Sequence, residues 1–345
     1  MDSDTGIRYA TAVPVMVPFQ EEHAVIARHP GIRTSFAIAA LPLIAALNAC
    51  ELPATDAAAA EIVSRAFREP DSLWAPIRRT FGQEGEAAEG YFRIDLPRSD
   101  LRVRIGKDAL SPDFEFTSYF GFAPAAGHGV LAIGEIVLRS DEVNAALAEA
   151  RRQGVHVTAL HNHLVGEEPR VMYMHVMAQG TPGSVATRLR SIVARTATPF
   201  DRMEGAGGTT ADWSAIDAVL GRHSEAEGDV AEYVFPRKEQ HSVHGLAVES
   251  TGMLETASEV VFQQLGDGRF ANTGELYVLP QEVEPVVRAL EDHGLNVTAI
   301  HNHMLDEQPT MYWIHWYATG EGATLARGVA AALAQTNSQR KAVRE

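Results

Sequence analysis

The chain contains one stretch twice: VTALHNHLVGEEPRVMYMH at 157–175 and VTAIHNHMLDEQPTMYWIH at 297–315. The likeness extends without a gap over 154–180 and 294–320. A repeat of this length is a duplicated domain rather than a solenoid unit. The sequence therefore predicts two equivalent domains in tandem.

The spacing of apolar residues predicts the same order of elements in both copies. A helix at 140–153 and its twin at 280–293 carry apolar residues at positions i, i+3, i+4 and i+7. Strands at 155–164 and 171–179 follow in the first copy, and a helix at 183–195 closes it. Because short turns join successive strands, we predict an α+β fold in which each repeat is a mostly antiparallel sheet with flanking helices.

Length and composition agree with two globular domains. The chain has 345 residues, and its apolar content of 46% is close to the globular average. The predicted parts are a leader at 1–50, a tether with a short helix at 51–70, repeat 1 at 71–202, a glycine-rich linker at 203–212 and repeat 2 at 213–338.

The leader has the pattern of a bacterial export signal. An apolar run of twelve residues at 36–47 follows Arg28 and Arg33, and it is too short to span a bilayer. The only cysteine, Cys50, comes directly after Leu-Asn-Ala, which resembles a lipobox. We expect a signal peptide that ends at Ala49, an acylated Cys50 and attachment to the membrane through that lipid alone. The alternative is a buried N-terminal helix with a core cysteine.

The repeated stretch brings metal-ligand side chains together. Side chains alternate between the faces of a strand, so His161 and His163 point the same way, about 7 Å apart, and Asn162 points to the other face. The chain turns at Glu167 and returns, which places His175 across from the first two histidines. The second copy has the same pattern in His301, Asn302, His303, Glu307 and His315.

Three imidazoles and one carboxylate on one sheet face suit a divalent transition metal: zinc, iron, manganese, copper or nickel. Four other residues could hydrogen-bond to the ligands: Asn162, Asn302, Glu135 and Glu275. Arg98 and Arg237 could bind an anionic group of a ligand, or they could cap a strand. We leave open whether the two sites are separate or whether the repeats face each other and share one.

Three kinds of function fit this pattern. A metalloenzyme would use an open coordination position on the ion. A binding lipoprotein would hold a metal ion or a small ligand without catalysis. In a structural module, the histidines would only form hydrogen bonds within the hairpin. A metal-free ligand or acid–base site also remains open.

The formal net charge of −16 argues against a nucleic-acid partner, because such proteins neutralise phosphates with Lys and Arg. The contiguous His-Asn-His is therefore not interpreted as an HNH nuclease motif, whose residues are spread over a ββα finger. We expect a metal ion or a small molecule as the partner. The sequence specifies no oligomeric state.

Several segments resemble the LppY/LpqO family of bacterial lipoproteins: PRSDL at 97–101, GEIVLRSDEVN at 134–144, the stretch at 157–175 and AIHNHMLDEQP at 299–309. The resemblance covers nearly everything after about residue 55. It implies an exported, lipid-anchored protein with two copies of a domain of unknown function. It supplies no reaction.

Overall fold

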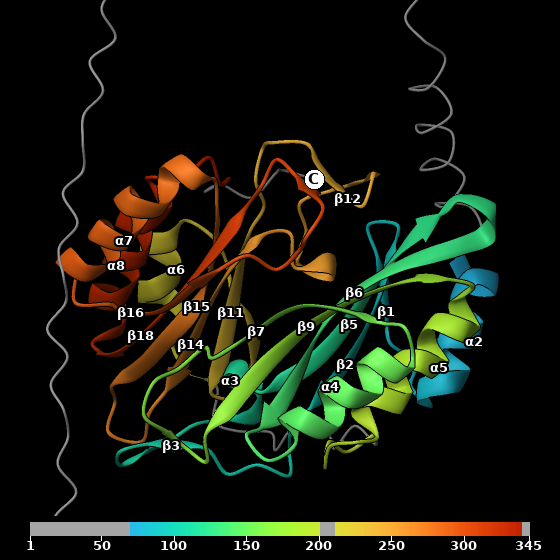
Figure 1. Cartoon of the computed structure of the whole chain (residues 1–345). Coiled ribbons are helices and arrows are strands. Elements are labelled where there is room, and N and C mark those ends of the chain that lie inside the picture. The colour runs from blue at the N-terminus through green and yellow to red at the C-terminus, as the bar shows by residue number, and fades with distance from the viewer. Residues whose placement is uncertain (1–69, 201–210, 340–345) are drawn as a thin grey trace, which may run out of the picture. The chain divides into compact units, whose positions relative to one another are not determined.

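A computed structural model describes residues 70–200 and 211–339 (Figure 1). The predicted leader, with Cys50, and nearly all of the predicted tether lie outside the described residues. Most of the predicted linker lies outside them too. Within the described ranges, no helix is long and apolar enough to cross a bilayer.

Repeat 1 is built on a six-stranded antiparallel sheet in the order β1-β2-β5-β6-β9-β7. Its strands are β1 (Glu86–Ala88), β2 (Tyr91–Pro97), β5 (Thr117–Ala125), β6 (Gly129–Arg139), β7 (His156–His161) and β9 (Val171–Gly180). Its helices are α2 (Pro70–Phe81), α3 (Pro112–Glu115), α4 (Val143–Arg152) and α5 (Pro182–Val193). A smaller sheet joins β3 (Arg104–Ile105), β4 (Asp108–Ala109) and β8 (Glu167–Glu168).

Repeat 2 has the same six-stranded topology, in the order β10-β11-β14-β15-β18-β16. Its strands are β10 (Glu225–Glu227), β11 (Val230–Phe235), β14 (Ser258–Gln264), β15 (Phe270–Val278), β16 (Asn296–His301) and β18 (Tyr312–Gly320). Its helices are α6 (Ser214–Leu220), α7 (Val283–Asp292) and α8 (Gly322–Leu333), and its smaller sheet joins β12 (His241–Val243), β13 (Leu246–Val248) and β17 (Glu307–Gln308). The predicted fold, two α+β repeats with antiparallel sheets and flanking helices, is confirmed.

The helices cover one face of each six-stranded sheet. In repeat 1 these helices are α2, α4 and α5 (Figure 1). Met174 and Val176 of β9 belong to the core cluster that includes residues of these helices. Their neighbours Tyr173, His175 and Met177 point to the opposite face and are buried as well. A strand buried on both faces reads as a continuous apolar run, as β9 does.

The faces without helices pack against each other, repeat on repeat. One shared apolar cluster joins Leu131 and Ile133 of β6 with Tyr277 and Trp313 of repeat 2. Another cluster contains, from both repeats, Val137, Tyr173, Val261 and Ala271. The described residues therefore form four layers: helices, sheet, sheet and helices. Burial of each large apolar side chain contributes about 1.5–3 kcal/mol, so these clusters hold the repeats together.

A glycine permits the closest approach between the repeats. A Cβ atom at Gly121 of β5 would lie 2.2 Å from the carbonyl oxygen of Met253, in the 3₁₀ helix η2 (Gly252–Leu254). Only glycine fits a position where two backbones come this close.

Candidate metal centre

Six histidines from the two copies of the motif meet in the layer between the sheets. We call them the imidazole cluster: His161, His163, His175, His301, His303 and His315. Each ring stacks on a ring of the other repeat. The centroids of His161 and His301 are 3.5 Å apart, those of His175 and His303 are 3.6 Å apart, and those of His163 and His315 are 4.0 Å apart. The pairing is reciprocal, as it is across a twofold axis.

The asparagine of the motif fastens this arrangement in repeat 1. Strand β7 ends at His161, and the chain then turns so that the amide of Asn162 donates to the carbonyl oxygen of Leu164 at 3.0 Å. The same amide donates to the carbonyl oxygen of Thr298, in repeat 2, at 3.2 Å. The hydroxyl of Thr298 in turn donates to the carbonyl of His163. The side chain of Asn162 therefore fixes the backbone of the site, while its backbone oxygen lies 3.1 Å from Nδ1 of His161.

Several ring nitrogens are buried without a hydrogen bond of acceptable geometry to any described residue: Nε2 of His161, both nitrogens of His175, both nitrogens of His303 and Nδ1 of His315. A buried polar atom without a partner costs about 1–3 kcal/mol, and native structures contain few of them. These nitrogens could serve as donors to a metal ion.

The two Nε2 atoms of His301 and His315 lie 2.8 Å apart. Two imidazoles on one tetrahedral ion, each about 2.0–2.1 Å from it, have their nitrogens roughly 3.3 Å apart. At 2.8 Å the two nitrogens are within hydrogen-bond distance, and they would have to move slightly apart to share an ion.

Two glutamates of repeat 1 hold His163 from both sides. Glu115 Oε2 lies 2.6 Å from its Nδ1, and Glu135 Oε2 lies 3.2 Å from its Nε2. Burial alone would lower the pKa of His163, but Glu135 and Glu115 raise it to about 10. The carboxylate of Glu135 also lies 3.0 Å from His175 Nε2, and these two histidines hold the pKa of Glu135 well below its usual range against the effect of burial.

The repeat 2 counterpart of Glu135 is Glu275. Its Oε2 is 3.5 Å from His303 Nε2 and 3.8 Å from His315 Nε2. Burial, followed by repulsion from other glutamates, raises its pKa well above the usual value.

Most of the imidazoles are neutral. Burial is the largest cause that lowers the pKa of His161 and of His301, the latter to about 3. Burial and the neighbouring histidines also depress the pKa of His303 and His315 well below the usual value. Neutral imidazole is the form that binds metal ions.

The cluster offers several sets of ligand atoms that lie within 4.8 Å of one another. These sets are His161, His175, His301 and His303; Glu135, His161, His163 and His175; His163, Glu275 and His315; and Glu255, Glu275 and His303. Two of the four sets combine residues of both repeats. These buried groups could hold a metal ion between the repeats.

The motif glutamates lie elsewhere than the sequence indicates. Glu167 belongs to β8, which pairs with β3, and its carboxylate accepts from the backbone nitrogen of Val171 at 3.3 Å. Glu307 accepts from the hydroxyl of Tyr277. Neither glutamate belongs to a set of potential ligands among the described residues. The carboxylates beside the imidazoles are Glu135 and Glu275, which the sequence suggested only as hydrogen-bond partners.

The two predicted anion-binding arginines are fully buried in ion pairs. Arg98 pairs with Asp100 and Glu142 and donates to the carbonyl oxygen of Val137 at 2.7 Å. Arg237 makes the equivalent contacts with Glu239, Glu282 and the carbonyl of Tyr277. Asn302 donates to the carbonyl oxygen of Met304 at 3.1 Å, and so orders backbone as Asn162 does.

A cavity of about 90 Å³ adjoins the imidazole cluster. We call it the acidic cavity. Its carboxyl groups are Asp113, Glu115, Glu135, Glu232, Glu255, Glu259 and Glu275, and Arg93, Thr117 and His163 also line it. The sequence carried a signal for four of these residues, because Glu115 and Glu255, like Glu135 and Glu275, occupy equivalent positions in the two copies.

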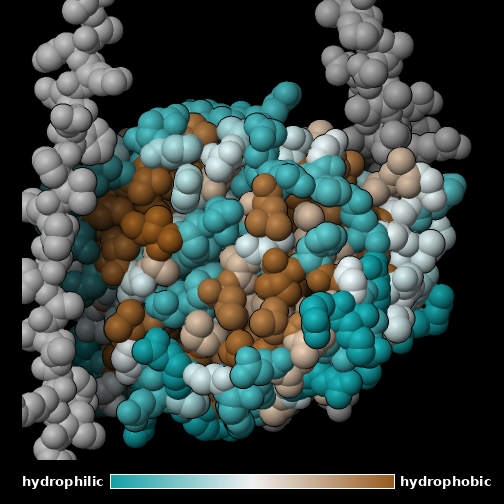
Figure 2. All heavy atoms as spheres, in the orientation of Figure 1, coloured by the Kyte–Doolittle hydropathy of each residue, from teal (hydrophilic) through white to brown (hydrophobic). Residues whose placement is uncertain are grey.

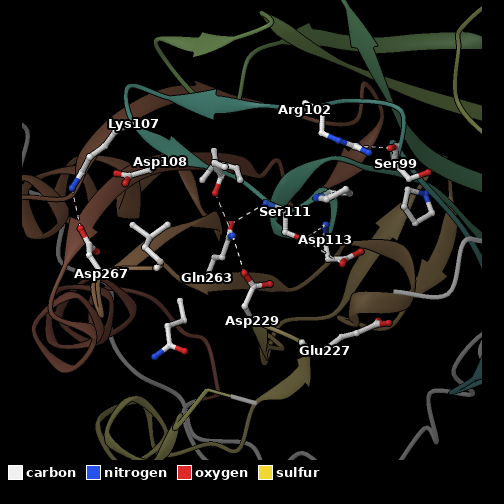
Figure 3. Close-up of a pocket in the computed structure, with 18 residues that line it drawn as sticks. Ser99, Arg102, Lys107, Asp108, Ser111, Asp113, Glu227, Asp229, Gln263 and Asp267 are labelled. Carbon is white, nitrogen blue, oxygen red and sulfur yellow. Dashed lines mark hydrogen bonds and ion pairs between the residues drawn. The ribbon is translucent and has the colours of Figure 1, made fainter. Parts of the chain in front are cut away.

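A wider cleft of about 740 Å³ lies between the repeats and shares Asp113 with the acidic cavity (Figure 3). Several of the polar groups drawn there bind one another. Gln263 accepts from the backbone nitrogen of Ser111 at 3.0 Å and donates to Asp229 at 3.1 Å, and Lys107 pairs with Asp267 at 2.9 Å. The outer surface drawn in Figure 2 is mixed, with apolar patches among hydrophilic residues. Among the described residues, buried polar atoms that lack partners are most concentrated in the imidazole cluster, and the acidic cavity contains two more, on Glu259 and Glu275.

Fold and site define a class: a tandem α+β protein whose two repeats enclose one buried His/Glu centre. The profile of a family described as "Domain of Unknown Function (DUF1259)" matches the chain twice, at 75–195 and 214–335. The chain belongs to that family.

Other comparisons add no function. No curated protein matches the chain significantly. Among solved structures, a trimeric bacterial microcompartment shell protein, PduB, is similar at 10% identity over 72% of this chain and 89% of its own, with a TM-score of 0.19. EtuB from Clostridium kluyveri is similar at 8% identity over 73% of this chain and 88% of its own, with a TM-score of 0.17. Such low TM-scores carry no argument.

Proposed function

We propose that the protein binds a divalent transition metal at one centre shared by its two repeats. The observation that carries this proposal is the group of buried imidazole nitrogens that have no hydrogen-bond partner among the described residues. A metal ion would supply the missing partner, and it would bind neutral imidazoles that the fold already holds close together.

The donor atoms narrow the choice of metal. Imidazole nitrogen suits zinc, copper, iron and nickel, whereas oxygen ligands suit manganese. Because the cluster has six imidazoles, we place zinc, iron, copper and nickel ahead of manganese. His163, held between two carboxylates, would give up its proton to become a ligand.

The acidic cavity favours a catalytic form of this function. A catalytic metal site keeps one side of the ion open for water or substrate, whereas a structural site is closed. The cavity lies beside Glu135 and Glu275, where water would have room next to a bound ion. Pulsed EPR of the copper form in D₂O tests this point, because only an open site shows deuterons of bound water.

We also propose that the protein is exported and anchored by an acylated Cys50, as the leader pattern and the resemblance to LppY/LpqO lipoproteins suggest. Metabolic labelling with a palmitate analogue, lost in a Cys50→Ser variant, would support the anchor. An unlabelled wild-type protein would refute it.

Elemental analysis tests metal binding directly. The untagged full-length protein is reconstituted with zinc, iron, copper or nickel and compared with a His163→Ala/His303→Ala variant. His156→Ala is the matched control, since His156 lies on the same strand β7 but is exposed. We expect tight binding by the wild type and the control, and loss in the double variant with its circular dichroism retained. No bound metal in the wild type, or full occupancy in the folded double variant, would overturn the proposal.

A further inference from the structure

We propose that the acidic cavity is a second cation site, which takes a hard divalent cation through carboxylate oxygens. This site lies beside the imidazole cluster but differs from it in donor chemistry. It does not require that a transition metal occupy the cluster.

The first argument is charge. Among the described residues, seven carboxyl groups line a cavity of about 90 Å³, together with one guanidinium, that of Arg93, and the imidazole of His163. Burying a carboxylate is costly unless a counter-charge or hydrogen bonds accompany it. If all of these carboxyls were ionised, the side chains that line the cavity would not balance their charge.

The second argument is the lack of partners. Glu275 is only 6% exposed, and its Oε2 makes no hydrogen bond of acceptable geometry to a described residue. Glu259 Oε1 is buried without a partner as well. Both residues line the cavity, so these oxygens are available to a cation within it.

Arg93 does not fill this role, because most of its donors are used elsewhere. Its Nε donates to Asp95 at 2.8 Å, and Nη1 donates to the carbonyl oxygen of Gly252 at 2.6 Å. Only Nη2 reaches a cavity carboxylate, Glu255, at 3.3 Å. The guanidinium thus secures one rim of the cavity at Glu255, and the cationic His163 pairs with Glu115 and Glu135, but neither group donates a hydrogen bond to Glu259 Oε1 or to Glu275 Oε2.

The titration of these groups supports the same conclusion. Burial, partly offset by Arg93, raises the pKa of Glu255 to about 8 and that of Glu232 to about 7. Burial and then repulsion from Glu232 and Glu255 raise the pKa of Glu259 well above its usual value. The carboxyls resist ionisation side by side, and a divalent cation would remove this repulsion.

The architecture gathers these carboxylates from both repeats. Arg93 lies opposite Glu86 in the register of the β1–β2 hairpin. The equivalent position in the β10–β11 hairpin, opposite Glu225, is occupied by Glu232. Glu259 lies opposite Glu275 in the sheet of repeat 2. At the equivalent position in repeat 1, Tyr119 lies opposite Glu135. Repeat 2 thus has a carboxylate at two positions where repeat 1 has none, and both of these carboxylates line the cavity.

Donor type selects the cation. Oxygen ligands alone suit calcium, magnesium and manganese(II), which bind six or more oxygens. A volume of about 90 Å³ accommodates an ion with two or three waters, since a water occupies roughly 30 Å³. Glu275 belongs to one set with His163 and His315 and to another with Glu255 and His303, so it lies between the two sites.

Manganese binding to the zinc-saturated full-length protein tests the proposal, because zinc occupies the imidazole cluster and the EPR signal reports free Mn²⁺. Glu232→Gln/Glu259→Gln alters residues that line the cavity and belong to no transition-metal ligand set. Glu284→Gln, an exposed position on α7, is the control. We expect calcium-competed Mn²⁺ binding in the wild type and the control, and binding at least roughly tenfold weaker in the double variant.

Zinc content is measured on every sample, so failure of the imidazole centre is distinguished from failure of the acidic cavity. The glutamine variant removes buried charge, and its thermal transition checks that it is folded. The proposal is overturned if the wild type binds no Mn²⁺ with or without zinc, or if the folded glutamine variant binds Mn²⁺ as tightly as the wild type.

Discussion

Replacing His303 with alanine distinguishes one shared centre from two separate ones. His303 belongs to repeat 2, yet its ring stacks at 3.6 Å on His175 of repeat 1, and both belong to one ligand set with His161 and His301. Structural zinc sites with four ligands bind with about 10–16 kcal/mol, or roughly 3 kcal/mol per ligand. Since 1.4 kcal/mol is a factor of ten, loss of one ligand should weaken zinc binding by about 100-fold.

The assay is zinc competition with a chromophoric chelator, followed by elemental analysis. His175→Ala is measured beside His303→Ala, because the two rings come from different repeats but serve the same set. We expect both variants to weaken the same ion by a similar factor. If each variant instead keeps one ion at wild-type affinity while losing another, each repeat has its own site and the reasoning is refuted.

Three further predictions concern stability. Arg98→Met should cost about 3–5 kcal/mol in urea unfolding, because it leaves the buried carboxylate of Glu142 without a cation. Zinc affinity should not change, and weakened zinc binding in the folded variant would contradict this structural role. The pKa of Glu232 in the folded protein, about 7, is above the ordinary glutamate pKa of 4.5, so its contribution to stability in metal-free protein is lost as pH rises through about 7. Glu232→Gln should therefore stabilise by up to roughly 3 kcal/mol near pH 8 and little near pH 5, as thermal unfolding at both pH values would show. An equal effect at both pH values would refute the assignment. Gly121→Ala should lower the free energy of unfolding by about 1–3 kcal/mol, measured by thermal unfolding, because the new methyl group would force the Met253 backbone away. Gly183→Ala is the control and should not destabilise, since its methyl group would only make ordinary contact with Pro76, at 3.5 Å. Equal effects of the two substitutions would contradict the close approach at Gly121.

Local pattern was enough to predict the repeats and the class of fold. Apolar spacing and strand alternation depend on neighbouring residues, so they identify α4 and β9 and place His161 and His163 near each other. The ends of elements are less well determined. The predicted strand at 155–164 ends at His161, because the chain turns there and Asn162 bonds across to repeat 2.

Pairing between distant segments explains what local pattern did not determine. Glu167 is near the histidines in sequence, but β8 pairs with β3, about sixty residues earlier, and this pairing directs its carboxylate elsewhere. Whether the repeats share a site also depends on contacts between distant residues. One signal was present: the nearly unbroken apolar run of β9 is typical of a strand with both faces buried.

The acidic cavity shows how far comparison of the two copies reaches. Glu115 and Glu255 are equivalent, so the repeat marks them as worth attention. Glu232 and Glu259 have no acidic counterpart in repeat 1, and in the sequence they look like ordinary strand residues. Only the packing of one sheet on the other brings all four together.

The reciprocal stacking of the histidines has a consequence for the history of the chain. A single repeat would expose the apolar face that the other repeat now covers, and two identical repeats would pair about a twofold axis to complete the same cluster. The chain thus has the geometry of a homodimer fused into one polypeptide. In a homodimer, any change at the position of Arg93 would appear twice around the axis. In the fused chain, repeat 1 has Arg93 where repeat 2 has Glu232. The site is therefore asymmetric, which a symmetric homodimer could not achieve.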